Sequence, residues 1–139
     1  MAPRWTQCPM VADAMCEHFR MIPNSLSPYL YSAVRVVFGF LWVLHGMQKY
    51  GLFGDEPLEM DSLRGVAGLI EIVAGTLITV GLFTRPAAFI ASGQMAAAYF
   101  ISHLPRGFWP IQNGGELSVL FCFLFLYIAS RGSGKWSVR

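Results

Sequence analysis

Charged residues are scarce in this sequence, and their scarcity limits the classes of protein that it can encode. Only 13% of the 139 residues are charged, whereas 55% are hydrophobic. A water-soluble domain carries about a quarter charged residues, because a small globule has more surface than core. Disorder is excluded by the same composition, since a disordered chain has few apolar residues. We therefore expect lipid to be the solvent for most of the chain.

Cysteine is also rare, and the excess of positive charge is small. Three cysteines are too few, and odd in number, for a disulfide-stapled secreted protein. A net charge of +2 does not indicate a nucleic-acid partner, and no stretch interleaves basic with aromatic residues. A phosphate-binding loop, a nucleophile elbow and a dinucleotide fingerprint are all missing. The sequence predicts no metal site, because it has no Glu-x-x-His pair and no two histidines at i and i+4.

Long apolar stretches are what the sequence does have. They cover residues 30–47, 63–83, 86–104 and 115–130. A helix rises about 1.5 Å per residue, so roughly 17 to 21 residues cross a hydrocarbon core of about 30 Å. Proline and glycine punctuate the connections, as they do at helix ends. We predict an all-α integral membrane protein, a four-helix up-and-down bundle formed by residues 29–139, preceded by a polar tail or surface helix at 1–28.

The basic residues predict an orientation for this bundle. One side of the predicted membrane holds Arg4, Arg20, Arg85, Arg131, Lys135 and Arg139. The other side mixes Lys49, Arg64 and Arg106 with several carboxylates. Because Lys and Arg favour the cytoplasmic side, we expect both termini in the cytoplasm. Arg35, close to the start of the first span, is expected to snorkel to that interface.

Glu71 is the strongest functional candidate, because a carboxyl group inside a membrane span is costly. It lies eight residues after Leu63, about 12 Å along the helix axis. Gly68 and Gly75 share its face, and small residues let another helix approach. Glu71 is therefore expected to face protein rather than lipid.

Other polar side chains are predicted to lie with Glu71 in the extracytoplasmic half of the bundle. They are His45, Lys49, Arg64, His103, Arg106, Asn113 and Glu116. Some of these positions also have a structural reading: Glu116 as a helix-start carboxylate paired with Arg106, and His45 and His103 as interfacial histidines. Gln94, in the third apolar stretch, is interpreted first as an interhelical hydrogen-bond anchor. A slot between helices, lined by aromatic residues and proton-exchanging groups, suits a quinone headgroup.

Several of these stretches resemble the DoxX family. The similarity is carried by His45-Gly46 with Lys49, by Gly68-Leu69-Ile70-Glu71, and by the block Arg106-Gly107-Phe108-Trp109-Pro110 followed by Asn113-Gly114-Gly115-Glu116. It runs from about Arg35 to the C-terminus, and the last block is its most specific part. The resemblance implies a four-span bacterial inner-membrane protein, related to a quinone-reducing subunit of a thiosulfate oxidoreductase.

We therefore expect a quinone-linked membrane subunit of a sulfur or oxidative-stress redox system. The predicted catalytic, proton-exchanging carboxylates are Glu71 and Glu116. The predicted quinone-binding residues are His45, Lys49, His103, Arg106, Trp109 and Asn113. A partner subunit must supply the electrons, because the chain has no visible electron donor of its own. The sequence leaves open a homo-oligomer and a non-catalytic scaffold with a buried polar network. It argues against a small-solute or ion conduit, because only Arg35 and a few hydroxyl groups are polar on the cytoplasmic side of Gln94.

Overall fold

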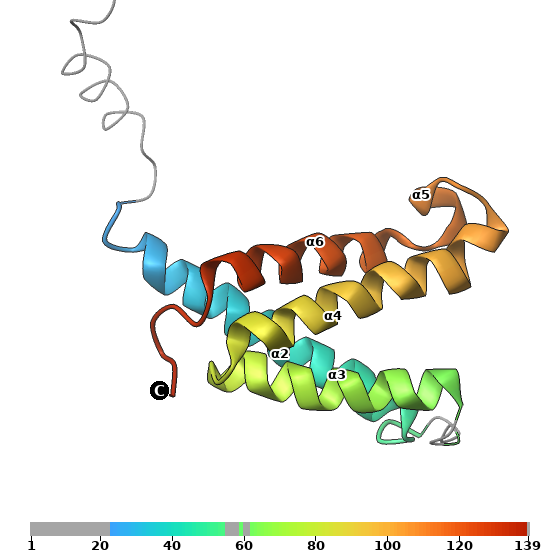
Figure 1. Cartoon of the computed structure of the whole chain (residues 1–139), viewed down its shortest axis with the longest axis horizontal. Helices are drawn as coiled ribbons and strands as arrows, with labels where there is room; N and C mark the ends of the chain where they lie inside the picture. Colours follow the sequence, from blue (N-terminus) through green and yellow to red (C-terminus); the bar gives the residue numbers. More distant parts are fainter. Residues whose placement is uncertain (1–22, 55–58, 60–61, 139) are drawn as a thin grey trace, which may run out of the picture.

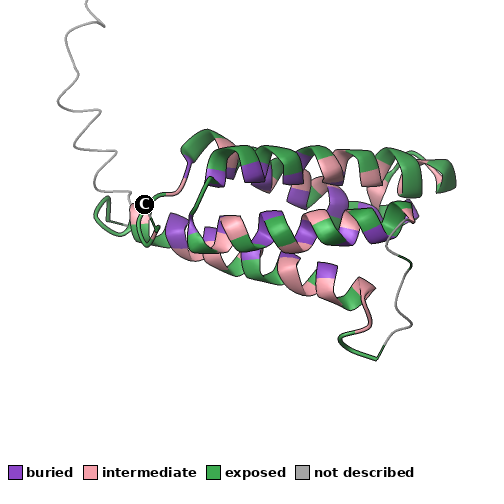
Figure 2. Cartoon of the chain, turned by 60° about the horizontal axis from the view of Figure 1, so that its bottom comes forward, coloured by how far each residue is buried: buried purple, intermediate pink, exposed green. Residues whose placement is uncertain are grey.

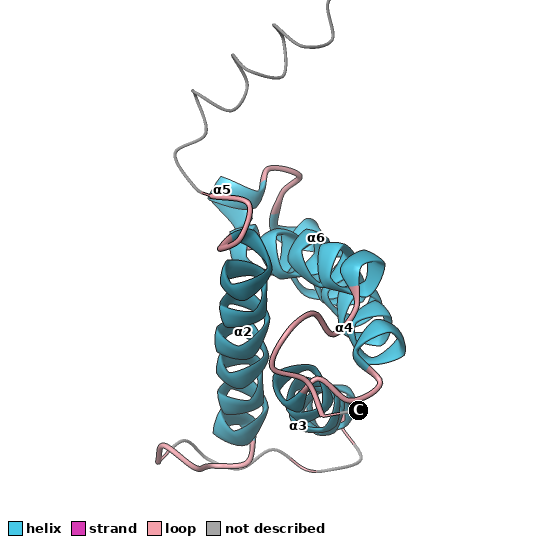
Figure 3. Cartoon of the chain, turned by 90° about the vertical axis from the view of Figure 1, so that its left-hand side faces the viewer, coloured by secondary structure: helices cyan, strands magenta, loops and turns pink. Residues whose placement is uncertain are grey.

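Four long helices make up most of the described chain. The computed structural model describes residues 23–54, 59 and 62–138, and every regular element in these ranges is a helix (Figure 3). The long helices are α2 (Ser27–Lys49), α3 (Leu63–Val80), α4 (Thr84–Ala98) and α6 (Glu116–Arg131) (Figure 1). The predicted all-α class is confirmed for this part of the chain. Residues 1–22, which make up most of the predicted N-terminal tail, lie outside the described residues.

Three short helices follow α4. The π-helix η2 (Tyr99–His103) continues α4 directly, and the 3₁₀-helix η3 (Leu104–Arg106) follows it. The four-residue helix α5 (Pro110–Asn113) then precedes α6. Among the described helices, α2 and α3 are long and apolar enough by themselves to cross a membrane. The 16 residues of α6 make a shorter apolar helix.

The turn between α3 and α4 explains where these two helices end and begin. Gly81 adopts a φ of 82°, and its N–H donates to the carbonyl of Leu77, which closes α3 at Val80. The helix is therefore slightly shorter than the predicted stretch of residues 63–83. Phe83 follows with a φ of 46°, and α4 begins at the next residue. This tight turn makes α3 and α4 neighbours.

Helices α2 and α3 pack closely because glycines meet across their interface. A Cβ on Gly46 would lie 2.7 Å from the carbonyl oxygen of Gly68. A Cβ on Gly75 would lie 3.0 Å from the carbonyl oxygen of Gly39. Both distances are too short for a side chain, so these positions require glycine at the present helix separation. Helix α4 packs against α6 and also contacts α3.

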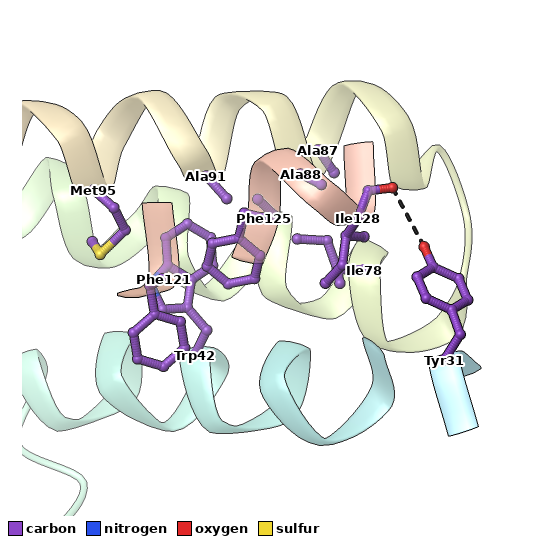
Figure 4. Close-up of a cluster of buried hydrophobic side chains, with 11 residues drawn as sticks. Tyr31, Trp42, Ile78, Ala87, Ala88, Ala91, Met95, Phe121, Phe125 and Ile128 are labelled. Atoms are coloured by element: carbon purple, nitrogen blue, oxygen red, sulfur yellow. Dashed lines mark hydrogen bonds between the residues drawn. The ribbon is translucent and has the colours of Figure 1, made fainter. Parts of the chain in front are cut away.

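Aromatic and small residues fill the interior. The rings of Trp42 and Phe125 lie 4.7 Å apart, and Phe121 stacks on Phe125 at 5.6 Å (Figure 4). Ala88 and Ala91 of α4 are fully buried beside them, which lets α4 approach these rings. The outward faces of the helices are exposed along their length (Figure 2), and they carry large apolar side chains such as Phe89 and Phe123. This pattern is typical of a protein that is surrounded by lipid.

We name the two ends of the helix array after basic residues that lie toward them. The Lys49 end contains the C-terminus of α2 and the N-termini of α3 and α6. The Arg35 end contains the N-termini of α2 and α4, the C-termini of α3 and α6, and the last described residues (Figure 1).

Arg35 does not snorkel, and that prediction was wrong. It is fully buried, and its Nη1 donates to the carbonyls of Ile78 and Thr79 at the end of α3. Its Nη2 donates to the carbonyls of Lys135 (3.3 Å) and Trp136 (2.8 Å). The last carbonyls of a helix lack partners within the helix and carry its negative dipole end, so they are suitable acceptors for a guanidinium.

Candidate functional site

A cavity of about 400 Å³ lies toward the Lys49 end, and all four long helices contribute to its lining. Its apolar wall includes the buried side chains of Trp42, Met95 and Phe121. Its polar lining includes His45, Lys49, Arg64, Glu71, His103 and Arg106. An apolar wall with a few convergent polar groups is the usual composition of a small-molecule site.

Glu71 is the central polar group of this cavity. It is only 2% exposed, so it faces protein as its glycine-lined helix face predicted. Its Oε1 accepts a hydrogen bond from Lys49 Nζ at 2.6 Å and another from Gln94 Nε2 at 2.9 Å. The same Gln94 nitrogen donates to the carbonyl of Ala67 at 3.1 Å. One carboxylate oxygen therefore ties α2, α3 and α4 together.

The local sequence explains how Lys49 reaches this carboxylate. Lys49 lies in the last turn of α2, where a positive charge is favoured by the helix dipole. Gly68 lies one turn before Glu71 on α3, and a Cβ at that position would approach Lys49 Cδ to 3.3 Å. The missing side chain thus leaves room for the lysine stem.

Two acceptor atoms beside this ion pair have no partner. Glu71 Oε2 and Gln94 Oε1 are buried, and neither receives a hydrogen bond from any residue that the structure describes. Both residues line the cavity. A buried acceptor without a donor costs about 1–3 kcal/mol, so a bound molecule that donates to these atoms would be favoured.

A second cluster of polar side chains surrounds His103, the last residue of η2. Its Nδ1 is 2.9 Å from Arg106 Nη2 and 3.2 Å from the carbonyl oxygen of Asn113. The ring stacks on Tyr99 with centroids 6.3 Å apart. Nδ1 accepts from Arg106 in one tautomer and donates to Asn113 in the other, and Nε2 takes the opposite role. The imidazole can therefore exchange a proton without leaving its position.

His45 lies on the α2 wall and has a more definite arrangement. Its Nδ1 is 3.0 Å from the carbonyl oxygen of Leu41, and a carbonyl only accepts, so Nδ1 is the donor. In the neutral ring Nε2 is then an acceptor. The ring meets Phe121 edge-on at 6.0 Å, so the cavity wall combines an aromatic face with a hydrogen-bonding atom.

Three of the predicted site residues lie away from this lining. Asn113 is buried in its own loop, where Nδ2 donates to the Gly107 carbonyl (2.6 Å) and Oδ1 accepts from the Gly115 N–H (2.7 Å). Trp109 is exposed and packs edge-on against Phe108 at 5.3 Å. Glu116 is exposed and lines a separate apolar groove on the outside of α6. The alternative pairing of Glu116 with Arg106 is not found, because the ion pair within the described ranges is Lys49–Glu71.

The structure thus brings together five predicted residues, His45, Lys49, Glu71, His103 and Arg106, and separates the other three. Two further lining residues were not predicted as binding residues. Gln94 is the interhelical anchor that its setting among alanines indicated, but it also reaches the cavity. Trp42 could have been found from its spacing, because positions 42, 45 and 49 fall on one face of a helix.

Comparison with known proteins identifies the family of this chain. The DoxX family profile matches residues 30–104, over half of the chain, so the block that we predicted to be the most specific lies beyond the matched residues. The chain is 44% identical over 115 residues to an uncharacterized protein of Haemophilus influenzae, covering 77% of this chain and 86% of that one. It is 28% identical over 127 residues to an uncharacterized membrane protein of Mycobacterium tuberculosis, covering 76% of each. No solved structure matches it. The chain belongs to the DoxX family of membrane proteins.

Proposed function

We infer that this DoxX family protein is a membrane subunit of a quinone-linked redox system, and that it binds a quinone or a similar small molecule in the cavity at the Lys49 end. The observation that carries the proposal is the carboxyl group of Glu71, buried in a residue that lines the cavity, with one oxygen hydrogen-bonded and the other without a donor among the described residues. A reduced quinone presents hydroxyl groups that can donate to such an oxygen. Trp42 and Phe121 supply flat apolar surface for the ring.

The chain's own residues suit binding and proton exchange. Lys49 fixes the negative charge of Glu71 and can be drawn toward a quinone oxygen, since its side chain is 29% exposed. His103, held by Arg106, can pass a proton through either ring nitrogen. A quinone supplies the electron acceptor when bound, and a partner subunit carrying a thiol, flavin or metal must supply the electrons. Such a partner would dock at the Lys49 end, where the cavity lies.

The proposal includes a location and topology. Four crossings of the bacterial inner membrane, with both termini in the cytoplasm, are supported by the apolar outward faces of the helices. Basic residues at the Arg35 end are Arg35, Arg85, Arg131 and Lys135, and none of the described carboxylates lies there. This asymmetry favours the cytoplasm for that end.

Ligand binding to the purified protein tests the proposal. In lipid nanodiscs, a short-chain quinone should quench tryptophan fluorescence in a saturable way, and Trp42→Phe should remove most of this signal. Glu71→Gln should weaken binding at least about tenfold, because it removes a charge-assisted hydrogen bond. Glu116→Gln is the matched control: the sequence prediction expects it to reduce binding, whereas its position outside the cavity predicts no change. Saturable quenching that is unaltered by Glu71→Gln would contradict the proposed site.

A non-catalytic scaffold is the second candidate, and the hydrogen bonds of Glu71 favour it. They join three helices, as expected of a network that locks the helix array. This role predicts that Glu71→Gln lowers the melting temperature strongly while no quinone binds the unaltered protein. The two functions are therefore separated by the same variant.

A further inference from the structure

A second cavity, at the Arg35 end, has a different chemical character. Its volume is about 400 Å³, and its lining includes Arg85 from α4, Arg131 from α6, and Lys135 from the segment after α6. Three basic side chains thus converge from three segments on one space. Carboxylates within the described ranges are Glu59, Glu71 and Glu116, and none of them lines this cavity.

The arginines are held in place by neutral contacts. The Arg131 guanidinium lies over the ring of Tyr31, with its Cζ 5.0 Å from the centroid, and 5.8 Å from the centroid of Tyr127. Arg85 packs over Gly132, where an added Cβ would lie 3.0 Å from Arg85 Nε. These contacts orient the positive charges without neutralising them. An anion is the ligand that such a cluster recognises.

Buried Arg35 holds in place the C-terminal segment that brings Lys135 to this cavity. Its Nη2 donates to the carbonyls of Lys135 and Trp136, and the N–H of Val138 donates to the carbonyl of Val80 at 3.1 Å. The segment that carries Lys135 is therefore attached to the end of α3. A preorganised wall reduces the entropic cost of binding.

The surroundings of the cavity indicate which anion it takes. Phe89 follows Arg85 by one helical turn and is 67% exposed, and Tyr127 precedes Arg131 by one turn and is 48% exposed. Both aromatic side chains therefore lie on the membrane side of their arginines. A free phosphate has no apolar part to pack against this surface, whereas the acyl chains of a lipid would lie along it.

We propose that Arg85, Arg131 and Lys135 form a binding site for the phosphate group of an anionic phospholipid at the end of the helix array where α4 begins. Basic pockets between helices on the cytoplasmic side of membrane proteins bind such headgroups. The arginines donate to the phosphate oxygens, and the acyl chains pack against the exposed faces of α4 and α6. The site is independent of the quinone proposal.

The test compares three ligands on the full chain, purified in a neutral detergent. Phosphatidylglycerol should raise the melting temperature and remain bound in native mass spectrometry. Phosphatidylcholine, whose own ammonium group neutralises its phosphate, should do neither. Sodium phosphate at the same concentration should also do neither. An equal shift with phosphatidylcholine would overturn the anionic specificity, and an equal shift with sodium phosphate would overturn the lipid assignment.

Variants locate the site. Arg85→Gln and Arg131→Gln should each weaken phosphatidylglycerol binding about fivefold. Lys135→Gln changes an exposed loop side chain, so it gives the same test without disturbing the contact of Arg131 with Tyr31. Arg64→Gln is the matched control, because Arg64 is an exposed arginine at the Lys49 end. Equal binding by Lys135→Gln, Arg85→Gln and the control would overturn the proposal.

Discussion

Glu71 and Arg35 are buried charged residues in different parts of the helix array, and their partners differ in kind. Arg35 gives its two Nη atoms to carbonyls at the end of α3 and in the C-terminal segment. Glu71 meets another side chain charge, from Lys49, and shares one oxygen with Gln94. Its other oxygen is buried without a donor among the described residues, in a side chain that lines a cavity, whereas Arg35 lines neither of the two cavities described above.

The difference separates a structural charge from a candidate site. Backbone carbonyls cannot be titrated or exchanged, so the partners of Arg35 make a permanent attachment. The partner of Glu71 is a flexible lysine side chain that is partly exposed, and the second oxygen of Glu71 has no donor among the described residues. Variants at the two positions should therefore differ in kind: loss of fold at one, and loss of binding at the other.

The largest expected effect is from Arg35→Met. It leaves the carbonyls of α3 and of the C-terminal segment without a donor, and it should destabilise the fold by about 3–5 kcal/mol. Chemical unfolding in detergent measures the change. The stability of Arg35→Lys should lie between that of the unaltered protein and that of Arg35→Met, because lysine keeps the charge but donates fewer hydrogen bonds. Unchanged stability of Arg35→Met would remove the contrast with Glu71.

The next effect is from Lys49→Met, which leaves the Glu71 carboxylate buried without its cation. We expect a loss of about 2–3 kcal/mol, less than for Arg35 because Lys49 is partly exposed. Adding Glu71→Gln in the same chain should restore more than half of this loss, because the uncompensated charge is then gone. A double variant whose loss equals the sum of the losses of Lys49→Met and Glu71→Gln alone would show that the pair is not coupled.

A smaller effect is expected at the glycine interface, which holds Lys49 and Glu71 within reach of each other. Gly46→Ala places a Cβ against the backbone of Gly68, so α2 and α3 must move apart. The expected cost is about 1–2 kcal/mol in unfolding measurements. Gly93→Ala is the control, since no atom lies within 4 Å of a Cβ at that position. Equal stability of the two variants would contradict the close packing.

The smallest effect is expected for Glu116→Gln. Glu116 is exposed on α6 and has no ion pair within the described ranges, so unfolding free energy should change by less than about 0.5 kcal/mol. Thermal unfolding of Glu116→Gln and Glu71→Gln under the same conditions compares the two positions. A loss of more than about 1 kcal/mol would show that Glu116 contributes to the fold after all.

The helices and the central carboxylate were predictable from the sequence, because apolar run length and glycine spacing act locally. The glycine-lined face of Glu71 correctly indicated a protein environment. Depth along a helix is also local, and it placed His45 and Lys49 near Glu71.

Rotation around a helix axis was harder to predict than depth. Glu116 lies at the predicted level, but it faces outward, because Ser118 and Phe121 take the inward face of α6. Asn113 was unpredictable for another reason: its side chain satisfies the backbone of its own loop. The partners of Arg35 are carbonyls some 40 to 100 residues away, and no sequence pattern reports such contacts.

The attachment of residues 135–136 to Arg35 has a practical consequence for mapping the topology of this protein. A reporter enzyme joined before residue 135 replaces Lys135 and Trp136, whose carbonyls accept hydrogen bonds from buried Arg35. Such a fusion would be misfolded or degraded, and its reporter signal would then be misread as the orientation of the native chain. Junctions after Val138 keep these acceptors and the hydrogen bond to Val80. Only such fusions read out the side of the membrane on which the native chain emerges.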